Sequence, residues 1–237
     1  ITDHMDLDFP ETPDFPANAF QFDLDEYFGQ LNRLKEQYKG KLDLRIGVEI
    51  GLQKHLGEAY HRLTEAYPFD FVIGSVHLVG GQDPYYRKIF EGRTDEEVYR
   101  MAFRETLENV EAVKDFDTLG HLDYVVRYGI HQAAEYSYRK FSDEIDAVLK
   151  KLIAEGKGLE MNLAGIKYGL GFPNPHPDVL KRYRELGGEI ITIGADAHEP
   201  AHVAYEFEKA TEILRECGFS YYAEFHGRKP VFQRIVP

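Results

Sequence analysis

Cysteine is almost absent from this sequence: Cys217 is the only one among 237 residues. A disulfide needs two cysteines and a thiolate metal cage needs several, so neither can form within one chain. Any bound metal must therefore be held by nitrogen and oxygen donors. Histidine, aspartate and glutamate are the candidate ligands.

Long apolar runs are also missing. Runs such as residues 71–76 have the length of a strand and fall well short of the roughly 20 residues that cross a bilayer. The chain does not open with a basic segment followed by an apolar stretch, the pattern of a secretion signal. We therefore expect no membrane span and a cytoplasmic location.

Positive charge is scarce, with 28 Lys and Arg against 41 Asp and Glu and a formal net charge of -13. Nucleic acids and anionic membranes are bound by clustered Lys and Arg, so this balance argues against both as partners. A small anionic substrate would need a locally positive site. Bound divalent cations can supply one inside an acidic protein.

The length of 237 residues suits a single large domain over 1–237, because α/β barrels reach this length without splitting. Amphipathic stretches alternate with short apolar runs. Helices are predicted over 23–38, 55–67, 94–114, 142–154, 177–187 and 200–216. Strands are predicted to end at Asp3-His4 and to cover 44–49, 69–77, 118–121, 159–162, 190–195, 221–225 and a short run near 231. This alternation predicts the α/β class with a mainly parallel sheet.

Metal-capable side chains stand where successive predicted strands end. They are Asp3 and His4, Glu49, His77, His121, Glu160 and Asn162, and Asp196 and His198. In a closed parallel barrel the carboxyl ends of the strands meet on one rim, so these residues are expected to converge. Neighbouring cations repel one another, and a bridging carboxylate such as Glu49 would neutralise them while imidazoles complete each coordination sphere. Asp3 and Asp123 are expected to orient the histidines.

Each of these residues also has a purely structural interpretation. A single histidine at a strand end is more often a hydrogen-bonded core or rim residue than a ligand. Glu49 is different, because it follows an apolar run where an unpaired buried carboxylate would be costly. The histidines on predicted helices and loops are interpreted as solvated surface residues, and His226 is left open. The surface set is His55, His61, His131, His176 and His202.

Six segments together resemble the motifs of a known family. They are Ile1-Thr2-Asp3-His4-Met5-Asp6, Val48-Glu49-Ile50-Gly51, Ile73-Gly74-Ser75-Val76-His77, Gly120-His121-Leu122-Asp123-Tyr124, Leu159-Glu160-Met161-Asn162 and Gly194-Ala195-Asp196-Ala197-His198. In order and spacing they resemble the monofunctional histidinol-phosphate phosphatases of the PHP (polymerase and histidinol phosphatase) superfamily, over almost the whole chain.

The resemblance implies a distorted seven-stranded, TIM-like β/α barrel with two to three divalent metal ions of zinc, iron or manganese type. It implies Glu49 as the bridging carboxylate, and His77 and His121 on one metal. It further implies Asp196 on a second metal, and His4 with His198 on a third.

One departure from the family concerns the start of the pattern. The family opens with a His-x-His pair on its first strand, followed by a short acidic and histidine element and a helix. This sequence opens at Ile1-Thr2-Asp3-His4, where the second strand of that pattern would end. We therefore expect a barrel lacking its first strand and helix. Such a barrel would be a truncated or proteolysed product, or another chain would supply the first strand and helix. A homo-oligomer is also left open.

The expected chemistry is hydrolysis of a phosphomonoester by a metal-bound hydroxide. The resemblance points to L-histidinol phosphate, giving L-histidinol and phosphate in histidine biosynthesis. Arg127 is expected to clamp the phosphate, because a guanidinium matches two phosphate oxygens. Lys167 and Arg139 are weaker candidates for the same role.

Two further roles are assigned from the sequence. Glu160 or Asp6 is expected to bind the ammonium group of the substrate. Asp196 and His198 are expected to act in catalysis, and Asp196, a rim histidine or metal-bound water would give the leaving alcohol its proton.

Alternative functions remain open at this point. One is a PHP phosphoesterase of another substrate, or a polymerase-associated exonuclease, although the acidic balance counts against nucleic acid. Another is a barrel fragment that binds metal or a partner without catalysis. A third is a metal-dependent amidohydrolase, but those enzymes typically use a Lys or His bridge and an opening His-x-His pair.

Overall fold

A computed structural model describes residues 1–236 of the chain. At its centre lies a six-stranded parallel sheet whose spatial order, β1-β2-β3-β4-β5-β6, is also the chain order. The strands are β1 (Thr2–Met5), β2 (Gly47–Gly51), β3 (Phe71–Ser75), β4 (Thr118–Leu119), β5 (Gly158–Asn162) and β6 (Ile191–Gly194). The predicted strands overlap these, with ends that differ by at most three residues. The α/β class with a parallel sheet is confirmed.

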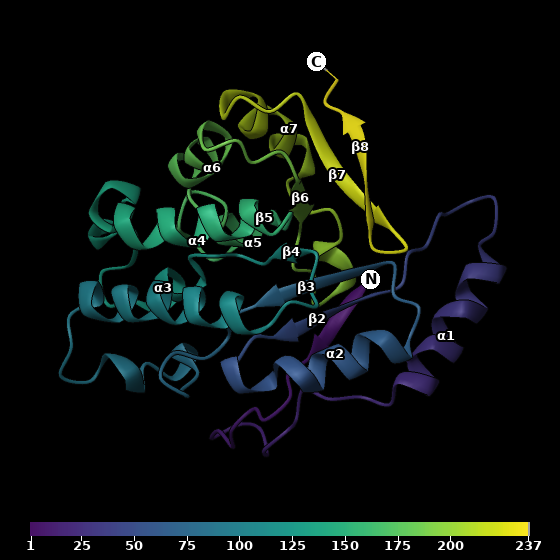
Figure 1. The fold of residues 1–237 in the computed structure, drawn as a ribbon, viewed down its shortest axis with the longest axis horizontal. Coiled ribbons are helices and arrows are strands. Elements are labelled where there is room, and N and C mark those ends of the chain that lie inside the picture. The colour runs from purple at the N-terminus through teal and green to yellow at the C-terminus, as the bar shows by residue number, and fades with distance from the viewer. Residues whose placement is uncertain (237) are drawn as a thin grey trace.

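Helices follow the strands and lie in an arc around the sheet (Figure 1). They are α1 (Leu24–Gln37), α2 (Gly57–Ala66), α3 (Asp95–Ala112), α4 (Ser142–Ala154), α5 (Ala164–Lys167), α6 (Pro177–Glu185) and α7 (Phe207–Glu216). Short 3₁₀ turns are η1 (Lys54–Leu56), η2 (Pro84–Tyr86), η3 (Lys88–Phe90), η4 (Tyr124–Tyr128), η5 (Gln132–Glu135), η6 (Tyr138–Phe141) and η7 (Pro200–His202). The sheet curls as a distorted TIM-like barrel with the helices outside, as expected.

Helix ends follow the capping chemistry of the sequence. The Asp23 side chain accepts from the Glu26 backbone N–H at 2.9 Å, and Thr94 with Glu97 forms a capping box at the start of α3. The start of the last helix was wrongly predicted at residue 200. Ala204 and Glu206 have φ values of +57° and +56°, which an α-helix does not accept, so α7 begins only at Phe207.

The last two strands leave the parallel pattern. β7 (Tyr221–His226) and β8 (Lys229–Arg234) form a separate antiparallel pair joined by Gly227 and Arg228. A two-residue connection permits only antiparallel pairing, because a parallel crossover needs a dozen residues or more. Backbone N–H groups of this turn donate to Asp70, which immediately precedes β3. The hairpin is thus fastened at the amino ends of the strands, away from the rim that carries the metal-capable residues.

A continuous apolar core fills the space between the sheet and the helices. It includes Val98 and Phe103 of α3 and Ile145 and Leu149 of α4, all fully buried. The core holds the outer helices against the strands and so fixes where each strand ends. Among residues 1–236, no helix combines the length and the apolar character that crossing a membrane requires.

Candidate metal centre

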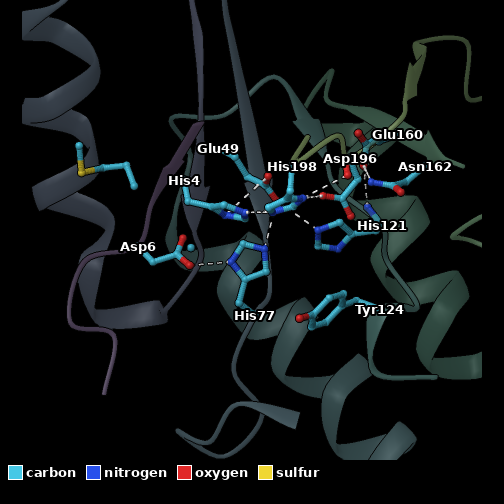
Figure 2. Close-up of polar contacts among 12 residues, drawn as sticks. His4, Asp6, Glu49, His77, His121, Tyr124, Glu160, Asn162, Asp196 and His198 are labelled. Carbon is cyan, nitrogen blue, oxygen red and sulfur yellow. Dashed lines mark hydrogen bonds and ion pairs between the residues drawn. The ribbon is translucent and has the colours of Figure 1, made fainter. Parts of the chain in front are cut away.

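Glu49 stands at the centre of a cluster on the carboxyl rim of the sheet (Figure 2). Parallel register places it beside His4 of β1, and the two side chains share one face. Glu49 Oε1 lies 3.1 Å from Nε2 of His77 and 3.1 Å from Nε2 of His121. Glu49 Oε2 lies 3.8 Å from His4 Nδ1. One carboxylate therefore faces three imidazoles delivered by three other strands.

Asp196 and His198 extend the cluster from the end of β6. His198 Nε2 lies 3.3 Å from His4 Nε2, and His198 Nδ1 lies 3.4 Å from Asp196 Oδ1. The sequence predicted six metal ligands, and the structure brings all six side chains together in one chain of contacts. They are His4, Glu49, His77, His121, Asp196 and His198.

The charge state of the cluster follows from burial and from pairing. Burial by itself would raise the pKa of Glu49, but the charge of His4 and hydrogen bonds from His121 and His77 hold that pKa well below its ordinary value. Burial would lower the pKa of His77, but Asp6 and Glu49 hold it well above the ordinary range. Burial dominates at His121 and lowers its pKa. The cluster thus combines an ionised carboxylate with imidazoles of different basicity.

Buried polar atoms without partners mark the same place. Among residues 1–236, Nδ1 of His4, Nδ1 of His121 and Oδ1 of Asp6 are buried and make no hydrogen bond. Such an atom costs about 1–3 kcal/mol unless something satisfies it. Donor atoms of His4, Glu49 and His77 lie within 4.8 Å of one another, close enough to share one ion. Imidazole and carboxylate are the donors that zinc accepts in the absence of thiolates, so the residues fit a divalent cation.

Asp6 has a role that the sequence analysis did not assign to it. Its Oδ2 lies 2.8 Å from His77 Nδ1, and both side chains are buried. The carboxylate fits this place because residue 51 is glycine: a Cβ there would lie 2.6 Å from Asp6 Oδ1. Asp6 therefore orients His77 and keeps its Nε2 turned toward Glu49.

The two carboxylates predicted to orient histidines do not contact the ligand set. Asp123 instead accepts from the Asn174 side chain and from the His176 backbone N–H, which secures the segment before α6. Asp3 is exposed, and among residues 1–236 no hydrogen bond or ion pair joins it to a cluster histidine. The reason is strand alternation: Asp3 and His4 are adjacent in β1 and face opposite sides.

A cavity of about 460 Å³ opens onto the cluster, and Arg127 of η4 forms part of its wall. The Arg127 side chain is only 3% exposed and donates to Asn174 Oδ1 (2.8 Å), Asp196 Oδ2 (3.2 Å) and Asn162 Oδ1 (3.3 Å). The rings of Tyr124 and Tyr168 lie 5.1 Å and 5.0 Å from its guanidinium carbon. The guanidinium is held rigidly at the edge of the candidate metal centre.

Asp196 is the acidic neighbour of Arg127. Burial alone would raise the pKa of Asp196, but the charges of Arg127, His121 and His198 together outweigh it and the net pKa is lowered. Asp196 is therefore a carboxylate, which suits a cation ligand better than a proton donor.

Three other residues predicted to contact substrate lie away from the cavity wall. Glu160 is 5% exposed and accepts from the His121 backbone N–H and from Asn162. Burial, with Glu49 and Asp196 nearby, raises the pKa of Glu160 to about 8. Lys167 Nζ donates to the Asp196 backbone carbonyl at 3.0 Å, and Arg139 is exposed on η6.

Sequence reasoning missed the aromatic part of the cavity wall. Phe9, Phe20, Tyr124, Tyr128 and Tyr168 line the cavity and come from loops and 3₁₀ turns. Loops and 3₁₀ turns lack the hydrophobic periodicity that shows which side chains of a helix or strand face inward. The positions of the candidate ligands at the strand ends do not indicate these aromatic residues either.

Residues 1–164 match the family model described as PHP domain. The chain belongs to the PHP family. A probable histidinol-phosphatase of Clostridium acetobutylicum is 32% identical to this PHP protein, over 98% of this chain and 83% of the relative. A histidinol-phosphatase of Lactococcus lactis is 31% identical, over 97% and 83%. Within the family the chain therefore groups with the histidinol-phosphatases, as the motifs predicted.

Solved structures agree with this grouping. The fold resembles that of a histidinol phosphate phosphatase from Lactococcus lactis, whose crystal contains zinc, L-histidinol and phosphate. The TM-score is 0.81 at 28% identity, over 97% of this chain and 85% of the other. A putative histidinol phosphatase from Listeria monocytogenes has a TM-score of 0.67 at 18% identity, over 87% and 88% of the two chains, and supports the fold alone.

Proposed function

We propose that this PHP protein hydrolyses L-histidinol phosphate to L-histidinol and phosphate with the help of bound divalent cations. The observation that carries the proposal is the convergence of Glu49, His77 and His121 at a cavity that also presents Arg127. The grouping with histidinol-phosphatases, and a relative crystallised with zinc, L-histidinol and phosphate, support the same substrate and zinc as the metal.

The six clustered side chains would hold the cations, with Glu49 shared between neighbouring ions. Divalent cations in such a site lower the pKa of water and neutralise phosphoryl oxygens. Glu49 reduces the repulsion between the ions, and Asp6 keeps the His77 ring in the orientation that presents Nε2. Two to three ions remain the predicted number.

Arg127 is proposed to bind the phosphoryl group. Its donors to Asn174, Asp196 and Asn162 fix the plane of the guanidinium before substrate arrives. A preorganised guanidinium stabilises developing negative charge without a reorganisation cost during the reaction. Two cavity-lining groups, Asp196 and His198, are the remaining catalytic candidates. Asp196, whose pKa is lowered, suits the proton transfer to the leaving alcohol less well than a rim histidine such as His198 or a water molecule.

Glu160 and Lys167 are proposed to act as positioning residues instead of substrate ligands. Glu160 accepts the His121 backbone N–H at 3.1 Å and so fixes the segment that carries this ligand. Lys167 donates to the backbone carbonyl of Asp196 and has the same effect on the loop after β6. Both residues thus stabilise backbone segments that carry candidate ligands without lining the cavity themselves.

Phosphate release from L-histidinol phosphate tests the proposal. We expect turnover by the zinc-loaded protein, loss on chelation and recovery on zinc addition. His121→Ala should abolish turnover, because it removes a ligand facing Glu49. His61→Ala is the matched control, since His61 pairs with Asp115 on the exposed surface. Turnover by His121→Ala at the wild-type rate would contradict the proposal, and full zinc loading without turnover would favour a purely metal-binding protein.

Several expectations from the sequence stay predictions. These are the single domain over 1–237, the cytoplasmic location, a homo-oligomer and a separate segment that completes the barrel. The amidohydrolase alternative receives no support from the relatives, which are named for phosphatase activity.

A further inference from the structure

Asp6, which orients His77, lies just outside the sheet, so strand pairing does not hold it in place. The pairing of β1 with β2 ends at Met5 and Ile50, one residue before Asp6. The Asp6 side chain has little anchorage of its own. Its Oδ2 contacts His77 (Figure 2), and among residues 1–236 its buried Oδ1 makes no hydrogen bond. The position of this carboxylate therefore depends on how the backbone around Asp6 is fixed.

Tyr60 of α2 contacts the backbone on both sides of Asp6. Its hydroxyl lies 3.1 Å from the Met5 carbonyl oxygen and accepts from the Leu7 backbone N–H at 3.1 Å. The same hydroxyl lies 2.9 Å from the carbonyl oxygen of Gly51, the last residue of β2. One phenol thus joins the carboxyl ends of β1 and β2 at the point where their pairing ends.

The backbone uses the whole hydrogen-bonding capacity of this hydroxyl. A tyrosine hydroxyl has one proton to donate and accepts through its oxygen. Burial raises the pKa of Tyr60, so the proton stays on the oxygen and is shared between the Met5 and Gly51 carbonyls. Tyr60 is 0% exposed and, in the part of the chain that the structure describes, it does not line the cavity. The hydroxyl is therefore not available to a substrate.

The two contacts beside Asp6 fix the direction of its side chain. The Met5 carbonyl belongs to the peptide plane before Asp6, and the Leu7 N–H belongs to the plane after it. Because peptide groups are planar, holding both planes fixes the φ and ψ angles of Asp6 and with them the direction of its Cβ. Two other bonds fasten the ends of the segment: Asp6 N–H donates to the Phe20 carbonyl and Gln53 Nε2 to the Leu7 carbonyl, each at 2.9 Å.

We propose that Tyr60 is a positioning residue of the metal centre: it directs the Asp6 carboxylate to His77, and so presents Nε2 of that histidine to a cation. The inference rests on the proposed function, which supplies the cations. Tyr60 itself contacts neither the candidate ligands nor the cavity. Loss of an outer partner of a metal ligand costs about 10- to 100-fold in metal affinity. Tyr60 acts on such a partner through the backbone, so we expect the lower end of this range.

The zinc affinity of Tyr60→Phe, measured by competition with a chromophoric chelator, tests this role. Phenylalanine keeps the buried ring and removes only the hydroxyl, and zinc should bind about 10-fold more weakly. Tyr183→Phe is the matched control. Tyr183 is also fully buried, and its hydroxyl lies 3.2 Å from the carbonyl oxygens of Lys157 and Ile190, which precede β5 and β6 at the amino ends of the strands. Both variants should lose stability in urea, and only Tyr60→Phe should lose zinc affinity.

A double variant shows whether Tyr60 acts through Asp6. In the Asp6→Asn background, Tyr60→Phe should have no further effect on zinc affinity, because the charge that Tyr60 positions is already gone. A second measurement needs no metal. In metal-free protein with ¹⁵N-labelled histidine, the His77 Nδ1 proton that faces Asp6 should exchange with solvent about 10-fold faster in Tyr60→Phe than in wild type or Tyr183→Phe.

The outcomes separate the role of Tyr60 from the proposed function. Unchanged zinc affinity in Tyr60→Phe, an equal loss in Tyr183→Phe or an additive loss in the double variant would overturn the positioning role while leaving the cation site intact. A wild-type protein that binds no zinc would instead refute metal-dependent hydrolysis. The His77 proton would then decide alone, and exchange at the wild-type rate in Tyr60→Phe would overturn the role of Tyr60.

Discussion

Asp6→Asn should weaken zinc binding while the protein stays folded. Asp6 Oδ2 lies 2.8 Å from His77 Nδ1, and His77 Nε2 lies 3.1 Å from Glu49. The carboxylate therefore fixes the proton on Nδ1, directs Nε2 to the metal and raises the basicity of the ring. Loss of such a partner costs about 10- to 100-fold in metal affinity, or about 1.4–2.8 kcal/mol. Asparagine has the same shape, so the effect should come from the charge.

Competition with a chromophoric chelator gives the zinc affinity of each variant. Asp8→Asn is the matched control, because Asp8 also pairs with a histidine, His55, at 3.0 Å, but on the exposed surface. We expect Asp8→Asn to bind zinc as tightly as wild type. Equal zinc affinity of Asp6→Asn and wild type would refute the role of Asp6, and an equal loss in both variants would reveal a general effect of charge.

Two further predictions concern stability. Gly194→Ala should lower the free energy of unfolding by about 1–3 kcal/mol, because the added Cβ would overlap the Glu160 carboxylate. In urea unfolding, the helical control Gly29→Ala should cost nothing, since its Cβ meets only Arg33 at 3.6 Å; an equal cost would contradict the clash. Burial raises the pKa of Glu160 from an ordinary 4.5 to about 8. The protonated Glu160 side chain therefore contributes fully to the stability of the folded protein below pH 4.5, and this contribution is lost as the pH rises toward 8. Metal-free Glu160→Gln should therefore gain stability over wild type across this range, and a difference independent of pH would count against the assignment.

The features that the sequence predicts best are the helix starts, which capping residues mark, and the candidate ligands, which stand at the strand ends. Asp23 and the Thr94–Glu97 box set helix starts through local hydrogen bonds, which need no knowledge of the rest of the fold. The candidate ligands could be found because parallel strands bring their carboxyl ends to one rim, whatever the details of packing. His4 and Glu49 meet for this reason, although they are 45 positions apart in the sequence.

Features that depend on irregular backbone could not be predicted in this way. Asp6 reaches His77 only because Gly51 leaves room for it, and Tyr124 and Tyr128 line the cavity from the 3₁₀ turn η4. Neither feature leaves a periodic pattern in the sequence. The positive φ of Ala204, which helps to delay the start of α7, is likewise invisible to helix propensity, because alanine is a good helix former.

The central claim is that side chains from distant strands share divalent cations through Glu49, and native mass spectrometry of zinc-loaded protein tests it directly. We predict at least two bound zinc ions in wild type and fewer in Glu49→Gln, because the amide keeps the shape but removes the bridging charge. An equal zinc content in the two proteins, or no zinc in wild type, would contradict the account.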